Sequence, residues 1–187
     1  MKISDFNLLY KIEFPDKKIV TGEGNPRPAI VLVGEAPGGE EEAQGRPFVG
    51  KAGKNLDEFL QLIELNREDI YITNAVKFRP TKLSDRGTVS NRTPTDAEVA
   101  EFLPFLMREL EILSPALTVT LGGTPLRALA GADAVVGREH GRLAERGGRL
   151  IYPLYHPASM IYNPSLRDVY RTDVLRLKDI LNERGLV

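Results

Sequence analysis

The stretch that decides the fold is Ala29-Ile30-Val31-Leu32-Val33-Gly34-Glu35-Ala36-Pro37-Gly38. Its first half is a short, unbroken apolar run, which is typical of a central strand in a parallel sheet that is covered on both faces. Its second half has the glycine and proline content of a loop. Open α/β sheets bind their ligands at loops that leave the carboxyl ends of strands, so this loop is expected to line the functional cleft.

Strand and helix patterns alternate along the rest of the chain. Strands are also predicted at residues 70–76, 116–121 and 149–154, and residues 79–94 are predicted to form a long surface loop. Between the strands, apolar residues recur at helical spacing, and Thr95 with Glu98 matches a capping box at one helix start. This order predicts an α/β fold, a three-layer α/β/α sandwich around a central four-stranded, mostly parallel sheet.

Composition bounds the class of protein. The 187 residues, 42% of them hydrophobic, are enough for one substantial core, so residues 1–187 are predicted to form a single domain. The chain has no cysteine, which excludes disulfides, thiolate zinc sites and thiol nucleophiles, and its two histidines argue against a metal site built from imidazoles. No apolar run is long enough to cross a membrane and the first residues are too charged for a signal peptide, so a cytoplasmic location is expected.

Four polar clusters follow the predicted strands, at residues 35–48, 74–79, 122–124 and 156–163, and motifs within or beside three of them carry a resemblance. The quoted loop is followed by Gly45-Arg46-Pro47-Phe48-Val49-Gly50-Lys51-Ala52-Gly53 and then by Tyr71-Ile72-Thr73-Asn74-Ala75-Val76-Lys77 and His156-Pro157. In this order, the motifs resemble those of family 4 of the uracil-DNA glycosylase superfamily, and the resemblance covers most of the chain. It implies an enzyme that hydrolyses the N-glycosidic bond of uracil in DNA and thereby initiates base-excision repair.

The resemblance assigns catalytic roles to three residues. Breaking the bond between uracil N1 and the sugar builds positive charge on the sugar and negative charge on the base, so acceptors are needed near one and donors near the other. His156 matches the histidine that donates a hydrogen bond to uracil O2. Glu35 matches the carboxylate that positions water or stabilises the cationic sugar, and Glu41 is a second candidate for handling water or for crowding the uracil C5 position. The order of importance of the two carboxylates is left open.

The same resemblance assigns residues to the base and to the DNA. Because a base inside a duplex is inaccessible, such an enzyme extrudes it and reads its exposed edge. Phe48 matches the stacking ring, Asn74 matches the amide that pairs with uracil O4 and N3–H, and Ala36 is expected beside them in the base pocket. Contacts to DNA are expected from a further set of residues, with Met160 as the apolar wedge in the vacated stack: Lys51, Arg79, Ala158, Ser159 and Met160.

The sequence departs from the family pattern in two places. Family 4 members usually hold an iron-sulfur cluster on four cysteines, and an ungapped placement puts Asn7, Tyr10, Phe78 and Phe102 at those positions. We expect an aromatic cluster to fill that volume and to anchor the N-terminal segment by packing. The second departure is Ala158, where the motif usually has a serine that holds a phosphate. No metal or organic cofactor is expected, because water is the nucleophile and hydrogen bonds stabilise the departing base.

Alternative functions remain open from sequence. The same chemistry on hypoxanthine or xanthine is one alternative, against which the amide of Asn74 argues. A catalytically silent nucleic-acid-binding module of the same fold is another: Glu35, Glu41 and His156 argue against it, whereas Ala158 and the missing cysteines leave it open. A small-molecule hydrolase on the same sheet would need a nucleophile elbow, which the sequence lacks. The expected partner is uracil-containing DNA, with no membrane association, and the chain is expected to act as a monomer.

Overall fold

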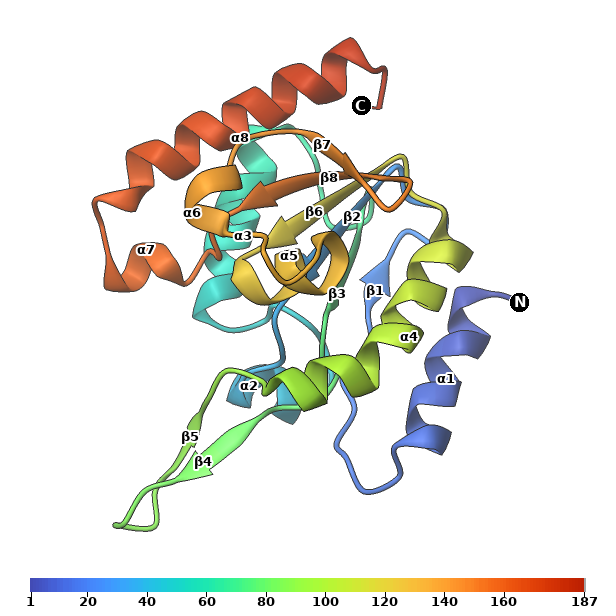
Figure 1. The fold of residues 1–187 in the computed structure, drawn as a ribbon, viewed down its shortest axis with the longest axis vertical. Coiled ribbons are helices and arrows are strands. Elements are labelled where there is room, and N and C mark those ends of the chain that lie inside the picture. The colour runs from blue at the N-terminus through green and yellow to red at the C-terminus, as the bar shows by residue number, and fades with distance from the viewer. Residues whose placement is uncertain (187) are drawn as a thin grey trace.

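A computed structural model describes residues 1–186 of the chain. The predicted strands are present as β2 (Ile30–Gly34), β3 (Tyr71–Asn74), β6 (Leu117–Leu121) and β8 (Arg149–Leu154). They pair in parallel in the order β3-β2-β6-β8 (Figure 1), which confirms the α/β prediction. Two short antiparallel strands, β1 (Glu23–Gly24) and β7 (Ala144–Arg146), extend the edges, so the sheet within residues 1–186 has six strands.

Alternate residues of the central strand face two different cores. Ile30 and Leu32 pack in one core with α3 (Lys51–Leu62) and α8 (Leu166–Glu183). Val31 and Val33 pack in the other core with α1 (Ile3–Glu13) and α4 (Asp96–Leu113). Because side chains alternate across a strand, an unbroken apolar run is what a sheet buried on both faces requires.

Helix boundaries follow the local signals in the sequence. Thr95 accepts a hydrogen bond from the backbone N–H of Glu98, whose carboxylate accepts from the backbone N–H of Thr95, so the predicted capping box starts α4. Another helix, α5 (Gly123–Ala130), carries Thr124 and Pro125 in its first turn. Short helices, which had no periodicity to predict them, complete the fold: α2 (Gly39–Gln44), α6 (Val136–Glu139) and α7 (Ser159–Tyr162).

Residues 79–94 were predicted to form a long surface loop, and they lie on the surface, but part of the segment is a β-hairpin. Two short strands, β4 (Thr81–Leu83) and β5 (Val89–Asn91), form an antiparallel hairpin that projects from the body of the molecule (Figure 1). Its turn is closed by a hydrogen bond from the Gly87 N–H to the Ser84 carbonyl, with Gly87 at φ +75°. Strands of three exposed residues leave no hydrophobic alternation in the sequence, and the Asp85-Arg86-Gly87 turn was their only signal.

Candidate active site

A cavity of about 1010 Å³ opens at the carboxyl ends of the parallel strands. Loops that follow β2, β3, β6 and β8 contribute to its wall, as expected for an open α/β sheet. The helices α3 and α5 both begin at this wall, so the partial positive charges of two helix N-termini lie near it. Near these two helix starts, a ligand group that carries or develops negative charge is favoured.

Glu35 is the first residue after β2, and its carboxylate lines this cavity. Its Oε2 atom accepts a hydrogen bond of 2.6 Å from the Thr124 hydroxyl at the start of α5, while Oε1 has no hydrogen bond within residues 1–186. The backbone around it is also held, because the Glu35 carbonyl accepts from the Val76 N–H beyond β3. The carboxylate is therefore oriented by one partner and retains free acceptor capacity toward the cavity.

Asn74 ends β3 directly beside Gly34, its partner in the sheet register. The residue is 3% exposed, lines the cavity, and its side-chain amide makes no hydrogen bond to the described part of the chain. A methyl group at Gly34 would overlap both Asn74 Oδ1 and the Phe48 ring, whose Cζ would lie 2.6 Å away. Glycine at position 34 therefore allows a hydrogen-bonding amide and an aromatic ring to meet at one side of the cavity.

His156 follows β8 and faces the same cavity, with its ring 5.8 Å from that of Phe48 between centroids. The Nδ1 atom accepts a hydrogen bond of 3.1 Å from the Ala158 N–H, which places the proton of the neutral ring on Nε2. Burial lowers the pKa of His156 to about 4, against the opposing influence of the Glu41 charge. The neutral ring thus has an Nε2–H donor that no group among residues 1–186 accepts.

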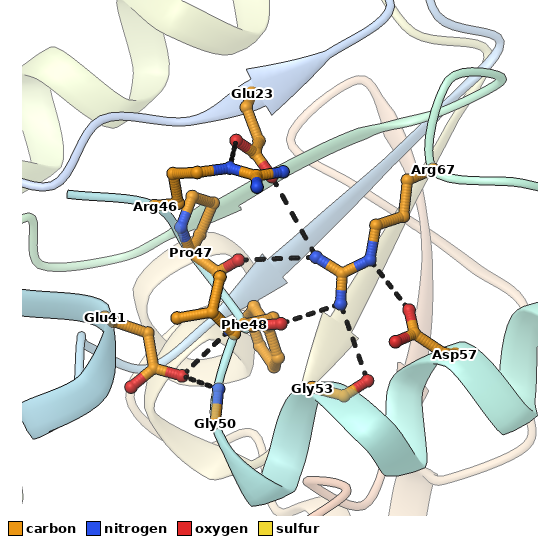
Figure 2. Close-up of polar contacts among 10 residues, drawn as sticks. Glu23, Glu41, Arg46, Pro47, Phe48, Gly50, Gly53, Asp57 and Arg67 are labelled. Atoms are coloured by element: carbon orange, nitrogen blue, oxygen red, sulfur yellow. Dashed lines mark hydrogen bonds and ion pairs between the residues drawn. The ribbon is translucent and has the colours of Figure 1, made fainter. Parts of the chain in front are cut away.

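Glu41 in α2 has a different environment from Glu35 (Figure 2). Its Oε1 accepts hydrogen bonds from the backbone N–H groups of Val49 and Gly50, and its Oε2 accepts from Gly38 N–H. Three backbone N–H groups therefore donate to this carboxylate. It connects Gly38, near the start of the glycine-rich loop (residues 34–53), to Val49 and Gly50 in the later part of that loop. This geometry is that of a residue that positions the loop rather than one with free capacity to handle water.

The remaining sequence-predicted residues divide into two groups. Ala36, Lys51, Ala158 and Ser159 line the cavity with the residues described above. Arg79 and Met160 do not: the Arg79 guanidinium binds Asn91 and Glu42, and Met160 packs partly buried against the core. The next two residues after Met160, both exposed, line the cavity instead: Ile161 and Tyr162.

Comparison with known proteins identifies the family. The family model of the Uracil DNA glycosylase superfamily matches residues 21–178. The chain belongs to this superfamily. It is 38% identical over 173 residues to the type-4 uracil-DNA glycosylase of Archaeoglobus fulgidus, with 88% of this chain and 83% of that protein covered. It is 39% identical over 171 residues to the type-4 uracil-DNA glycosylase of Thermotoga maritima, with 89% and 85% covered.

A solved structure supports the similarity of the fold and nothing more. The crystal structure of SMUG2 from Pedobacter heparinus superimposes with a TM-score of 0.60 at 16% identity, covering 84% of this chain and 77% of that one. The superfamily's α/β architecture is thus retained in this chain.

The helices were also compared with the length of a membrane span. Within residues 1–186, no helix combines the length and apolarity needed to cross a lipid bilayer.

The residues that the resemblance places at the cysteine positions of family 4, Asn7, Tyr10, Phe78 and Phe102, do not fit an iron-sulfur cluster, because such clusters are held by cysteine thiolates. Three of them pack together: the Phe102 ring lies 6.4 Å from Tyr10 and 5.7 Å from Phe78 between centroids. Phe14 stacks on Phe102 at 4.2 Å. Asn7 lies outside this stack and donates a hydrogen bond to the Tyr71 hydroxyl. The rings join α1 to α4, so packing connects the segments in the way that we expected.

Proposed function

We propose that this protein is a uracil-DNA glycosylase, which hydrolyses the N-glycosidic bond of uracil in DNA and initiates base-excision repair. The observation that supports this most is the convergence of Glu35, Asn74 and His156 on one cavity, each with an unused hydrogen-bonding atom. These residues lie at or just beyond the carboxyl ends of three different strands. Such a set of groups supplies an acceptor, an amide and a neutral donor, which are what uracil excision requires. Membership of the superfamily and the type-4 relatives support the same reaction.

In the proposed reaction, water replaces the base on the sugar carbon while the bonding electrons leave with uracil. Glu35 stabilises the positive charge that grows on the sugar and orients the attacking water through its free oxygen. His156 donates from Nε2 to uracil O2, where negative charge accumulates, and it does so as a neutral ring. A preorganised donor of this type contributes roughly 10²- to 10³-fold in rate.

Selection of uracil depends on Asn74 in this proposal. Its amide donates to uracil O4 and accepts from N3–H, whereas cytosine presents the opposite polarity at both positions. A bound cytosine would leave buried polar groups unpaired, which is a strong basis for rejection. The Phe48 ring stacks on the face of the extruded base, with Ala36 nearby in the cavity wall.

Polar residues of the cavity wall are proposed to contact the DNA. Lys51, Ala158 and Ser159 line the cavity, and so does Lys82 of the β4–β5 hairpin. Lys82 has no ion-pair partner within residues 1–186, so its charge is available to a phosphate. Met160 of α7 packs partly buried against the core, so the exposed Ile161 and Tyr162 of the same helix are better placed to act as the wedge.

The test uses single- and double-stranded oligonucleotides that contain one uracil, incubated with the protein and then treated with alkali. Strand cleavage at the uracil is expected, and the absence of an abasic product in both substrates would refute the proposal. His156→Ala is expected to slow excision roughly 10²- to 10³-fold. Asn74→Asp is expected to weaken the preference for uracil over cytosine, with Lys18→Gln on the surface as a control. Parallel substrates with hypoxanthine or xanthine decide between uracil and another deaminated base.

We further propose that residues 1–187 act as one cytoplasmic domain and as a monomer. Both cores share the same sheet, which supports a single unit. Sedimentation of the free and DNA-bound protein tests the monomer, with a dimer as the contradicting outcome.

A further inference from the structure

Arg67 lies in the turn before β3, outside the cavity, yet its guanidinium reaches the glycine-rich loop (Figure 2). Its Nη2 atom donates a hydrogen bond of 2.7 Å to the Phe48 carbonyl. Its Nε donates at 2.7 Å to Asp57 of α3, and Nη1 lies 3.9 Å from Glu23 of β1. Asp57 therefore holds the guanidinium by a hydrogen bond, Glu23 adds a negative charge within ion-pair distance, and the Nη groups donate to backbone carbonyls of residues 47, 48 and 53.

The Phe48 backbone needs such support. Phe48 has φ +53°, in the left-handed region that side chains other than glycine rarely adopt, where strain is of the order of 1–3 kcal/mol. The Phe48 carbonyl points toward Gly53 of α3, where a methyl group would collide with it. This conformation turns the carbonyl away from the cavity and the ring toward it, beside His156. The direction of the ring thus depends on a strained peptide.

Opposite charges hold the two sides of this peptide segment. Arg67 binds the carbonyl of Phe48, while Glu41 accepts from the N–H groups of Val49 and Gly50. A cation is thus matched to carbonyl oxygens and an anion to amide hydrogens, which are the strong, charge-assisted forms of these bonds. Neither Arg67 nor Glu41 needs to touch the base to control where the ring lies.

We propose that Arg67 is a positioning residue for uracil excision: from behind the loop, it holds Phe48 in the left-handed conformation that places the ring under the base. The inference rests on the proposed glycosylase function. It assigns a role in the reaction to a residue that lies outside the cavity wall. A purely structural role would make Arg67 a contributor to stability alone, with effects on excision that are independent of Phe48.

The closing experiment combines kinetics with amide hydrogen exchange on the whole protein. Arg67→Gln is expected to slow single-turnover excision about 10- to 100-fold. Arg67→Lys keeps the charge but loses the planar fork, so it should lie between Arg67→Gln and the unmodified protein. Arg46→Gln is the matched control, because Arg46 also binds Glu23 but is exposed and donates no side-chain bond to this segment.

The decisive comparison repeats Arg67→Gln in a Phe48→Leu background. If Arg67 acts through Phe48, Arg67→Gln should slow excision by no more than about twofold in the Phe48→Leu background. An equal loss in both backgrounds, or unchanged excision by Arg67→Gln alone, would overturn the proposal. The exchange measurement needs no activity: Arg67→Gln should speed exchange of the Val49 and Gly50 amides, and unchanged protection would overturn it. If the unmodified protein excises no uracil, only the proposed function fails, and exchange still decides whether Arg67 holds the loop.

Discussion

The ammonium of Lys77 lies 2.6 Å from Glu109 Oε2, and both side chains are completely buried. The same ammonium donates a hydrogen bond of 2.6 Å to the Asn74 carbonyl. Glu109 also accepts hydrogen bonds from the hydroxyl groups of Tyr10 and Tyr71. Burial lowers the pKa of Lys77, and the charge of Glu109 opposes that shift. An ion pair inside the core thus connects the aromatic packing of α1 to the strand end that carries Asn74.

Removal of one partner from this pair should destabilise the protein strongly. Lys77→Met leaves the Glu109 carboxylate buried without its cation, so the free energy of unfolding should fall by about 3–5 kcal/mol. The double variant Lys77→Met with Glu109→Leu removes both charges and should recover most of that loss. Urea denaturation measures both, and a single variant as stable as the unmodified protein would contradict the ion pair.

The protonation state of His156 gives a prediction for pH dependence. The pKa of His156 is about 4 in the folded protein against an ordinary value of 6.5. Between these values the unfolded chain takes up a proton that the folded one does not, so His156 lowers stability as pH falls from about 6.5 to 4. NMR titration of the two imidazoles should show His156 neutral, with the proton on Nε2, down to about pH 4. A midpoint near 6.5 would contradict the assignment.

Gly34 allows a sharp test of the base pocket. Gly34→Ala introduces a methyl group where Asn74 Oδ1 and the Phe48 ring now lie, so both groups must move. Misplacement of about 1 Å slows enzymes by about 10²-fold, and a similar loss of excision is expected here. Gly137→Ala in α6 is the matched control, because its methyl group would have only an ordinary contact, 3.8 Å from Tyr155. Equal activity of the two variants would show that the pocket tolerates the methyl group.

Substitutions of Glu35 and Glu41 should have different effects on stability and on excision. Glu35→Gln should slow excision with little change in the melting temperature, since its carboxylate accepts one hydrogen bond, from Thr124. Glu41→Gln disturbs three backbone donors and should lower stability by about 1–3 kcal/mol as well as slow excision. Thermal unfolding beside single-turnover excision measures both effects. If Glu35→Gln lowered stability and Glu41→Gln slowed excision without doing so, the roles assigned to the two carboxylates would have to be exchanged.

The aromatic packing between α1 and α4 predicts a protein that folds without iron. Purified protein should show no visible absorption and no iron by elemental analysis, and either signal would refute the replacement of the cluster by rings. Phe102→Ala should lower the free energy of unfolding by about 3–5 kcal/mol, because Phe102 is completely buried. Leu8→Ala, on the exposed face of α1, is the control and should change it by less than about 0.5 kcal/mol.

The sequence predicted those parts of the molecule whose signals are local. The four parallel strands and the capped start of α4 follow from apolar runs and a capping box, and the motifs identified the cavity residues Glu35, Asn74 and His156. What it did not show depends on contacts between distant segments. Nothing near Arg67 indicates that its guanidinium reaches the Phe48 carbonyl, and nothing near Glu41 indicates that its oxygens are occupied. The exposed hairpin β4–β5 was missed because its strands bury nothing.

The packing of Tyr10, Phe78 and Phe102 has a consequence for the conditions that this chain tolerates. Thiolates and iron are attacked by peroxide and other oxidants, and iron is removed by chelators. The packed rings of Tyr10, Phe78 and Phe102 contain neither a thiolate nor iron. The packing that supports the strand end at Asn74 therefore contains no iron and no thiolate whose loss would disturb it.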